Sequence, residues 1–436
     1  MSDLGDRLKR RAVQQRAVEV EGPATPVEDR SDVLARLRRK MARIEERDRS
    51  SAERTGSPAV APPDTAGERV VPDRCLPGGE VMTSRGGVWV NKVVYRDYAH
   101  GTAEVRAWLR AGHGLAVMGQ DERLRPLLAR GALFVDTETT GLSGGAGTLP
   151  FLVGTGWFED VDFVVEHLFC RDPDEEEAQL ELLAARMARA SCLVSFNGKA
   201  FDIPLINTRF VLHRMANPGA ALPHLDLLQV CRRIFSRRLN DRSLQNIERA
   251  VLGFVREGDI PGSLIPAVYV DWLRGTDRTS MATVLSHNAL DIVALAALGG
   301  VLEAMYGDPA AVAHAADSLG LAQAALRAGA GDDADGHLQR ADKTGDDGDR
   351  QTALHLRAKK ALQAGDHEAA FRLWQDIVAA FPDDATAHLR LAKYLEHRRK
   401  DAAAALLHAE RSLDAEGVDA NERRLARLKK KMENGK

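Results

Sequence analysis

Cysteines, aromatic residues and net charge are all scarce in this chain of 436 residues. It has four cysteines, and none of them lies in a Cys-x-x-Cys pair, so we expect neither a zinc site of that type nor a disulfide framework. The 60 basic and 63 acidic side chains leave a formal net charge of −3, which excludes a protein that condenses nucleic acid through bulk positive charge. Any contact with nucleic acid must therefore come from local basic patches.

The sequence also lacks the usual signals of export and membrane insertion. Its first residues contain no apolar stretch like that of a secretory signal peptide, and no run of about 18 uncharged apolar residues occurs. We therefore expect a cytoplasmic protein without membrane contact, whose cysteines are inert, reduced thiols.

Aromatic residues make up only 5% of the chain, and none precedes Trp89. A segment without large apolar side chains buries too little surface to offset the entropy lost on ordering. We therefore predict that residues 1–86 form a disordered or partly helical tail, with a linker rich in Pro, Gly and Ser over 50–67. A basic tail that assists nucleic-acid binding is the alternative to a merely solvated leader.

The pattern of apolar residues predicts two further parts before the C-terminal region. Residues 87–130 contain short strand-like runs and are expected to form a small β/helix lead-in element, with 115–118 extending it as a strand. Residues 131–306 form the main domain, with expected strands at 132–136, 148–158, 163–169 and 192–196. A helix follows the third strand, so this order predicts an α/β fold with a mixed sheet flanked by helices.

After residue 309 the chain becomes rich in alanine and helical in pattern. Ala370, Trp374 and Pro382 are spaced as in a tetratricopeptide unit, and Ala404 lies one repeat of about 34 residues after Ala370. His408, however, stands where a large apolar residue is usual. We predict that residues 311–430 form all-α tetratricopeptide-like helix pairs that can bind a protein partner; the alternative is a generic helical bundle.

The first acidic pair that indicates chemistry is Asp136 and Glu138, at the end of the first expected strand of the main domain. Side chains two residues apart on a strand point to the same face. Two carboxylates on one face repel each other, and a divalent cation between them makes the arrangement favourable. The alternative is a pair of solvated acids in a loop.

Two more acidic positions follow in different contexts. Asp202 ends the run Asn-Gly-Lys-Ala-Phe-Asp at 197–202, and it is suited both to cap a helix and to face a metal-bound water. His287 and Asp291 lie four residues apart in the helical pattern 281–298, so they share a helix face. A neutral imidazole beside a metal-ligating Asp is well placed to accept a proton from an attacking water.

Together these contexts resemble the DEDD superfamily of 3′–5′ exonucleases, which share the ribonuclease H-like fold. Asp136 and Glu138 match the D-x-E of the first motif, residues 197–202 match the N-x-x-x-[FY]-D of the second, and residues 287–291 fall on the third. The resemblance covers about residues 131–305. The glycine-rich stretch 140–148 and the C-terminal repeats narrow it to the bacterial YprB-like group.

The resemblance implies a metal-dependent hydrolase that cleaves phosphodiester bonds of DNA or RNA with two Mg²⁺ or Mn²⁺ ions. Asp136, Glu138, Asp202 and Asp291 would hold the ions. Members of this superfamily carry Tyr four residues, or His five residues, before the last Asp, whereas His287 lies four residues before Asp291. The identity of the proton acceptor is therefore open. The competing hypotheses are a scaffold protein with a catalytically weak nuclease-like domain and an endonuclease on the same fold.

Further positions are candidates for contact with nucleic acid or for support of the metals. The stretch 231–249 is the best candidate for a phosphate-binding surface, unless it is a solvated helix face. In similar proteins an Asp follows the second motif at the distance of Asp226, which would lie near the metals, hold His224, or cap a helix. The candidates for nucleic-acid contact are Asn197, Lys199, Arg232, Arg233, Arg237 and Arg238.

Overall fold

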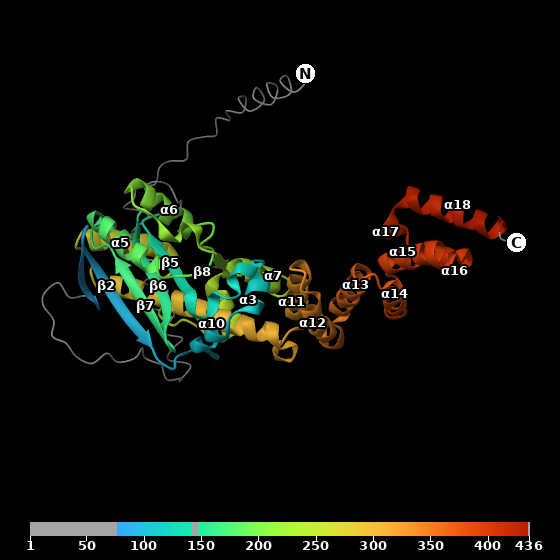
Figure 1. Cartoon of the computed structure of the whole chain (residues 1–436), viewed down its shortest axis with the longest axis horizontal. Helices are drawn as coiled ribbons and strands as arrows, with labels where there is room; N and C mark the ends of the chain where they lie inside the picture. Colours follow the sequence, from blue (N-terminus) through green and yellow to red (C-terminus); the bar gives the residue numbers. More distant parts are fainter. Residues whose placement is uncertain (1–75, 142–146, 435–436) are drawn as a thin grey trace, which may run out of the picture. The chain divides into compact units, whose positions relative to one another are not determined.

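The computed structural model describes residues 76–141 and 147–434, all within the second of two units into which the chain divides after Gly67 (Figure 1). Most of the predicted N-terminal tail and the centre of the glycine-rich stretch, residues 142–146, lie outside the described residues.

A seven-stranded mixed sheet forms the centre of the described unit, with strand order β1-β2-β7-β6-β5-β8-β9. Its strands β5, β8 and β9 run parallel, and the other neighbours pair antiparallel. The sheet and a small ribbon of β3 and β4 comprise β1 (Gly79–Thr83), β2 (Gly86–Tyr95), β3 (Ala99–His100), β4 (Ala103–Glu104), β5 (Ala132–Thr139), β6 (Pro150–Glu159), β7 (Asp162–Phe169), β8 (Cys192–Ser195) and β9 (His224–Asp226).

The mixed sheet flanked by helices confirms the predicted fold class, and β5 to β8 form where the sequence predicted strands. The boundaries before residue 131 differ from the expectation. β2 pairs with β7 from Trp89–Phe169 to Tyr95–Phe163, and β1 pairs with β2, so this segment belongs to the main sheet. Residues 79–86, which the sequence predicted to lie in the N-terminal tail, therefore belong to the sheet and its first turn. Strand pairing with a distant partner leaves no mark on the local sequence, which is why both boundaries were misplaced.

Residues 115–118, expected as a strand, lie instead in helix α3. They are fully buried, and a short apolar run that is buried on all sides has no periodicity to distinguish helix from strand. The helices around the sheet are α3 (His113–Gly119), α4 (Leu128–Gly131), α5 (Glu176–Met187), α6 (Asp202–Leu212), α7 (Leu227–Ile234), α8 (Leu244–Ile247), α9 (Ile265–Leu273) and α10 (Met281–Gly307).

The two faces of the sheet are covered by different helices, with α5 and α6 on one side and α10 on the other (Figure 1). Alternate residues of β5 face these two layers. Leu133 and Val135 pack with α5 and α6, whereas Ala132 and Phe134 pack with α10. Because side chains alternate along a strand, Asp136 continues the face that meets α10.

Helix α10 approaches β6 closely because two residues of that strand are glycines. A Cβ atom added to Gly154 would lie 1.8 Å from Oδ1 of Asn288, and one added to Gly156 would lie 2.5 Å from Cγ2 of Ile292. Gly154 pairs with Asp136 across the sheet. The glycines therefore bring one face of α10 down to the level of the acidic strand end.

Among the described residues, α10 is the one helix whose length and hydropathy would suit a membrane span. Its 18-residue apolar window is, however, 72% buried inside the protein. This burial identifies α10 as the central core helix of the domain, and its side chains join the largest hydrophobic cluster.

The region after residue 311 is helical, as predicted, and consecutive helices pack against one another. The first of these helices also extend the main core, since Leu319, Leu338 and Ala353 belong to its cluster. Farther along, Ala370 and Trp374 are buried in a smaller cluster, and the tetratricopeptide character remains a prediction. The helices are α11 (Ala315–Arg327), α12 (Gly331–Thr344), α13 (Asp347–Gln363), α14 (His367–Ala380), α15 (Ala385–Tyr394), α16 (Ala402–Ala409), α17 (Leu413–Glu416) and α18 (Val418–Asn434).

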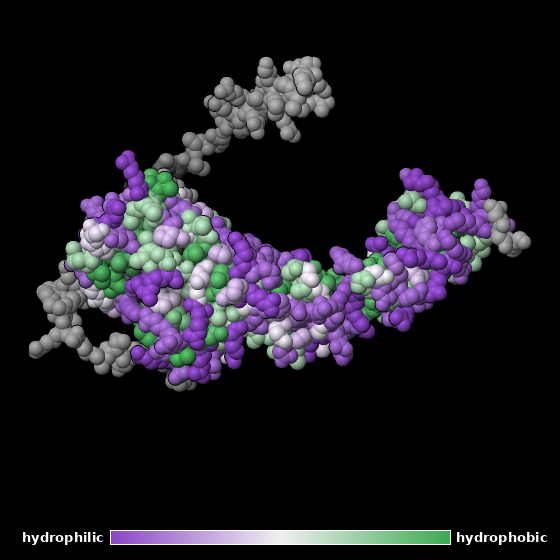
Figure 2. Space-filling view, viewed as in Figure 1, coloured by the Kyte–Doolittle hydropathy of each residue, from purple (hydrophilic) through white to green (hydrophobic). Residues whose placement is uncertain are grey.

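The visible surface of the last helices is largely hydrophilic (Figure 2). Between α15 and α16 the chain makes a π-helical turn, Leu395–Arg399, whose Glu396 is buried beneath α18. These helices therefore combine small apolar clusters with internal ion pairs.

Candidate metal-dependent active site

The predicted carboxylates meet at the C-terminal end of β5. Asp136 and Glu138 come from β5 itself, Asp202 is the first residue of α6, and Asp291 lies on α10. Asp136 experiences the negative charges of Asp291, Asp202 and Glu138 together. The three motifs, separated by more than half of the domain in sequence, therefore form one acidic site.

The pKa values of these acids show how unfavourable the site is without a cation. Burial, followed by the charges of the other three acids, raises the pKa of Asp136 well above its usual range. Burial also raises the pKa of Glu138 to about 8 and that of Asp202 to about 6. The charged forms of neighbouring carboxylates disfavour one another, so the group is poised to bind positive charge.

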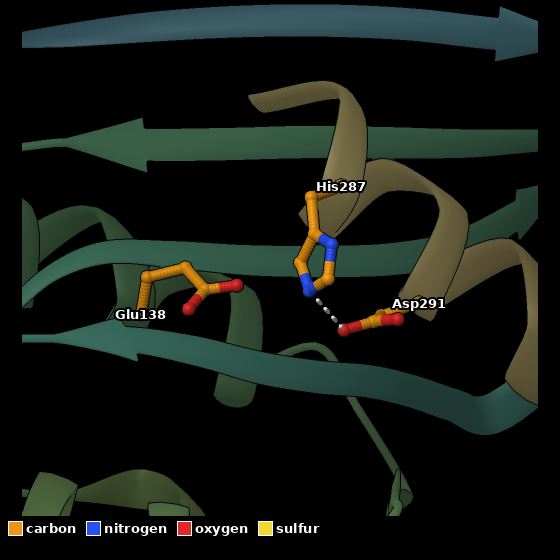
Figure 3. A group of neighbouring side chains, drawn as sticks. All are labelled: Glu138, His287 and Asp291. Atoms are coloured by element: carbon orange, nitrogen blue, oxygen red, sulfur yellow. Dashed lines mark ion pairs between the residues drawn. The ribbon is translucent and has the colours of Figure 1, made fainter. Parts of the chain in front are cut away.

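His287 lies between two of these acids (Figure 3). Ligand atoms of Glu138, His287 and Asp291 all lie within 4.8 Å of one another, and Nε2 of His287 is 3.6 Å from Oδ2 of Asp291. The His287 side chain is only 9% exposed. Burial lowers its pKa, but the hydrogen bond to Asp259 and the charges of Asp291, Asp259 and Glu138 outweigh this and raise the pKa overall.

Asp136 and Asp202 are each held in place by a hydrogen bond from a neighbouring side chain. Nδ2 of Asn288 donates to Oδ2 of Asp136 at 2.8 Å, and Oγ1 of Thr137 donates to Oδ1 of Asp202. Such contacts orient carboxylates before a metal binds. Thr137 points to the α6 side of β5, and its hydrogen bond holds the carboxylate of Asp202 at the end of that strand. There the charge of Asp202 acts on Asp136.

His287 and Asp291 are also held in place by neighbouring polar side chains. Nδ1 of His287 lies 2.8 and 2.9 Å from the two carboxylate oxygens of Asp259, and Nη2 of Arg256 donates to Oδ1 of Asp291. Arg256 is 4% exposed and also donates from Nε to Oε2 of Glu248 at 2.8 Å. These surrounding acids keep the pKa of Arg256 above its usual value despite its burial.

Sequence reasoning missed the second set of groups: Arg256, Asp259, Glu248 and Asn288. Only Asn288 carried a local signal, since it lies three residues before Asp291 and shares its helix face. Arg256 and Asp259 follow the π-helical turn η5 (Glu248–Leu252) in irregular chain, where no periodicity predicts what a side chain contacts.

Asp226 and His224 support the turn of the second motif. Asp226 accepts hydrogen bonds from the backbone N–H of Asn197 at 2.9 Å and of Lys199 at 3.2 Å, and it also caps α7. His224 lies 2.8 Å from Oγ of Ser195. These contacts hold the turn that precedes Asp202, and of the alternatives for Asp226 the structure shows the helix cap. The Lys199 side chain is exposed there.

The arginines of 231–249 have a different environment from the one predicted. Arg237 pairs with Asp349 at 3.1 Å and Arg238 with Asp317 at 2.9 Å, both on C-terminal helices, while Arg233 donates to the backbone oxygen of Met118. These contacts join the sheet domain to the helices that follow it. Arg237 and Arg238 each have a carboxylate partner within the chain, and the phosphate-binding role of these arginines remains a prediction. Arg232 is exposed and stays a candidate.

The site fits divalent cations by the chemistry of its donors. Four carboxylates supply oxygen atoms, which Mg²⁺ and Mn²⁺ prefer. The amide of Asn288 turns its Nδ2 toward Asp136, so it holds this carboxylate and leaves the oxygen donors to the acids. Asp136, Glu138 and Asp291 stay partly accessible, as entry of an ion requires.

Comparison with known proteins agrees with this geometry. Residues 133–302 match a family model described as the RNase_H superfamily. The chain is also 32% identical over 344 residues to a Bacillus subtilis (strain 168) protein described as uncharacterized protein YprB, covering 75% of this chain and 80% of that protein. The chain therefore belongs to the ribonuclease H-like superfamily, among the YprB-like proteins.

Proposed function

We propose that this protein is a metal-dependent nuclease of the 3′–5′ exonuclease type, which hydrolyses phosphodiester bonds of DNA or RNA with two divalent ions. The observation that carries the proposal is the convergence of Asp136, Glu138, Asp202 and Asp291 on one accessible site. The chain supplies Arg256 as the one nearby buried cation among the described residues, which is too little positive charge for these acids.

In this proposal the four carboxylates hold the ions, and the groups behind them keep the carboxylates in place. Divalent ions in such a site activate water and stabilise the charge that develops on the phosphate and the leaving oxygen. Thr137, Asn288 and Arg256 fix the orientation of Asp202, Asp136 and Asp291 before substrate arrives. The exposed Lys199 is available to contact a substrate phosphate.

The experiment is a cleavage assay on purified full-length protein. Single-stranded DNA and RNA labelled at the 5′ end are incubated with Mg²⁺, Mn²⁺ or EDTA, and the wild type is compared with Asp136→Asn. We expect a metal-dependent ladder of shortened products and a loss of rate by about 10³-fold or more in the variant, because the removed charge binds the ions.

Two results would contradict the proposal. Equal cleavage by the wild type and Asp136→Asn would place the activity outside this site. Binding of labelled strands without any cleavage would favour the scaffold hypothesis, in which the C-terminal helices recruit a protein partner. Asp162→Asn, a substitution in a surface ion pair with Arg96 at the far end of β7, serves as the matched control and should retain full activity.

The described cysteines accord with the cytoplasmic location that we propose. Cys170, Cys192 and Cys231 are free and buried, and burial raises the pKa of Cys192 to about 12. Such thiols are unreactive core groups, as the sequence predicted. Cys75 lies outside the described residues.

A further inference from the structure

We infer that His287 is a metal ligand, which together with Glu138 and Asp291 forms a mixed nitrogen and oxygen site that selects a first-row transition-metal ion over Mg²⁺. The inference deepens the proposed function and rests on it for the identity of the metal centre. It gives His287 a different role from that of proton acceptor, which the sequence suggested.

The first argument is the tautomer of the imidazole. Both oxygens of Asp259 lie within 2.9 Å of Nδ1, so the ring of a neutral His287 carries its proton on that nitrogen. The lone pair is then on Nε2. Histidines that bind metals usually donate their other ring N–H to a carboxylate in this way, and Asp259 is therefore a positioning residue for His287.

The second argument is the direction in which Nε2 points. It faces Oδ2 of Asp291 at 3.6 Å, with the carboxylate of Glu138 on the other side (Figure 3). Two ligands that each lie about 2.1 Å from one ion are separated by about 3.0–4.2 Å. The separation of 3.6 Å between Nε2 of His287 and Oδ2 of Asp291 falls within this range.

The third argument is the way in which Asp291 is held. Arg256 takes Oδ1, and Oδ2 faces His287. Arg256 itself is held by Glu248, whose Oε1 lies 2.7 Å from Nε2 of the buried His100. This chain of buried contacts leaves one oxygen of Asp291 directed toward the lone pair of His287.

The donor set determines the class of ion. Imidazole nitrogen binds Mn²⁺, Fe²⁺, Co²⁺ and Zn²⁺ readily, whereas Mg²⁺ prefers a shell of oxygen atoms alone. A site with one imidazole and two carboxylates therefore favours the transition metals. Asp136 accepts a hydrogen bond from Asn288 and Asp202 accepts one from Thr137, and these two carboxylates are suited to the all-oxygen site of the second ion.

The test measures metal binding without any nucleic acid, on the full-length chain with Mn²⁺ as the probe. Electron paramagnetic resonance of free Mn²⁺ gives the affinity, and electron spin-echo modulation detects a nitrogen nucleus bound to the ion. We expect nitrogen modulation in the wild type. We expect His287→Gln to lose this modulation and to bind Mn²⁺ about 10- to 100-fold more weakly, with a change of no more than about 3-fold for Mg²⁺ measured by competition.

Asp259→Asn is the second variant, because it leaves His287 in place and preserves side-chain volume. Its amide can donate to Nδ1, which moves the ring proton to Nε2 and removes the lone pair that binds the metal. We expect it to weaken Mn²⁺ binding about 10-fold and to reduce the nitrogen modulation. The control is His314→Gln, an exposed residue before α11, which should change neither measurement.

The outcomes separate this inference from the proposed nuclease function. Mn²⁺ bound tightly without nitrogen modulation would overturn the role of His287 and leave the four-carboxylate site intact. Equal weakening of Mn²⁺ and Mg²⁺ in His287→Gln would overturn the selectivity. Absence of Mn²⁺ binding by the wild type would overturn both the inference and the metal-dependent function.

Discussion

Glu138 in the sheet domain is partly buried and Glu396 in the C-terminal helices is buried, and their pKa values move in opposite directions. Glu396 is contacted by Arg424 at 2.8 Å, Arg427 at 2.7 Å and Lys431 at 2.9 Å. Its hydrogen bonds with Arg427 and Lys431 outweigh its burial and lower its pKa to about 2. The helices therefore supply from α18 the positive charge that their buried acid requires.

Among the described residues, Glu138 lacks a comparable set of Arg and Lys partners. Burial raises its pKa to about 8, with Asp291 and Asp202 adding to the rise and His287 opposing it. Glu396 is matched by cations within the chain, whereas the acids of the proposed metal site are left partly unmatched. The difference indicates which of the two regions is built to receive ions from solution.

The largest effect is expected from removing the cation that the site does contain. Arg256→Met would leave Glu248, Asp259 and Asp291 without their buried partner, and we expect it to lower the free energy of unfolding by about 3 kcal/mol or more. Urea unfolding of metal-free protein measures this. Arg96→Met, in an exposed ion pair, should change stability by less than about 0.5 kcal/mol. Equal effects of the two substitutions would mean that the buried network is not structural.

Glu396→Gln tests the other side of the comparison. It leaves three cations of α18 without their shared acid, and we expect a loss of about 2 kcal/mol of stability. Glu159→Gln, which breaks an exposed pair with Lys92, is the control and should be nearly neutral. A neutral Glu396→Gln would show that α18 is held by its apolar contacts alone.

Glu138→Gln should act with the opposite sign. In metal-free protein at neutral pH it removes a carboxylate from a crowded acidic site, and we expect a gain of about 1 kcal/mol in stability. The same variant should lose most of the rise in melting temperature that Mn²⁺ produces in the wild type. Thermal unfolding with and without Mn²⁺ measures both effects. Destabilisation of the metal-free variant would remove the contrast with Glu396.

The smallest effect, per unit of pH, is expected in the pH dependence of stability of the metal-free protein. The folded-state pKa values of Glu138, about 8, and Asp202, about 6, exceed those of the unfolded chain, so the folded state retains protons that the unfolded state has lost. Stability should therefore fall between pH 5 and pH 8, by about 0.5 kcal/mol per unit. Urea unfolding at a series of pH values measures the slope. Saturating Mn²⁺ should flatten it, and a rising slope would contradict the assignment.

The periodic parts of the sequence predicted much of this structure. The apolar runs at 132–136 and 163–169 are strands, and the pattern 281–298 lies within α10. The helical spacing of His287 and Asp291 placed both on one face, and the structure brings them together. Local spacing was sufficient because the residues compared lie on the same strand or the same helix.

Relations between distant elements were predicted less well. The pairing of β2 with β7 and the ion pairs that bind the arginines after α7 to the C-terminal helices each depend on a partner far away in the sequence. For Arg237 the missing information was Asp349, which no local pattern connects to it. Arg237 and Arg238 therefore also contribute to an interface within the chain, which the basic run did not indicate.

The sequence by itself determined the acidic end of β5, the acids Asp202 and Asp291 that we propose as its co-ligands, and the mixed sheet that holds them, because motif spacing and apolar periodicity are local properties. Only the tertiary structure decided which neighbouring side chain forms a hydrogen bond with each residue of the proposed site. Asn288 reaches Asp136 because Gly154 lets α10 approach, and Asp259 and Arg256 arrive from an irregular segment. Such contacts follow from how the helices pack against the sheet. That packing determines which side-chain atoms remain available to the proposed metal ions.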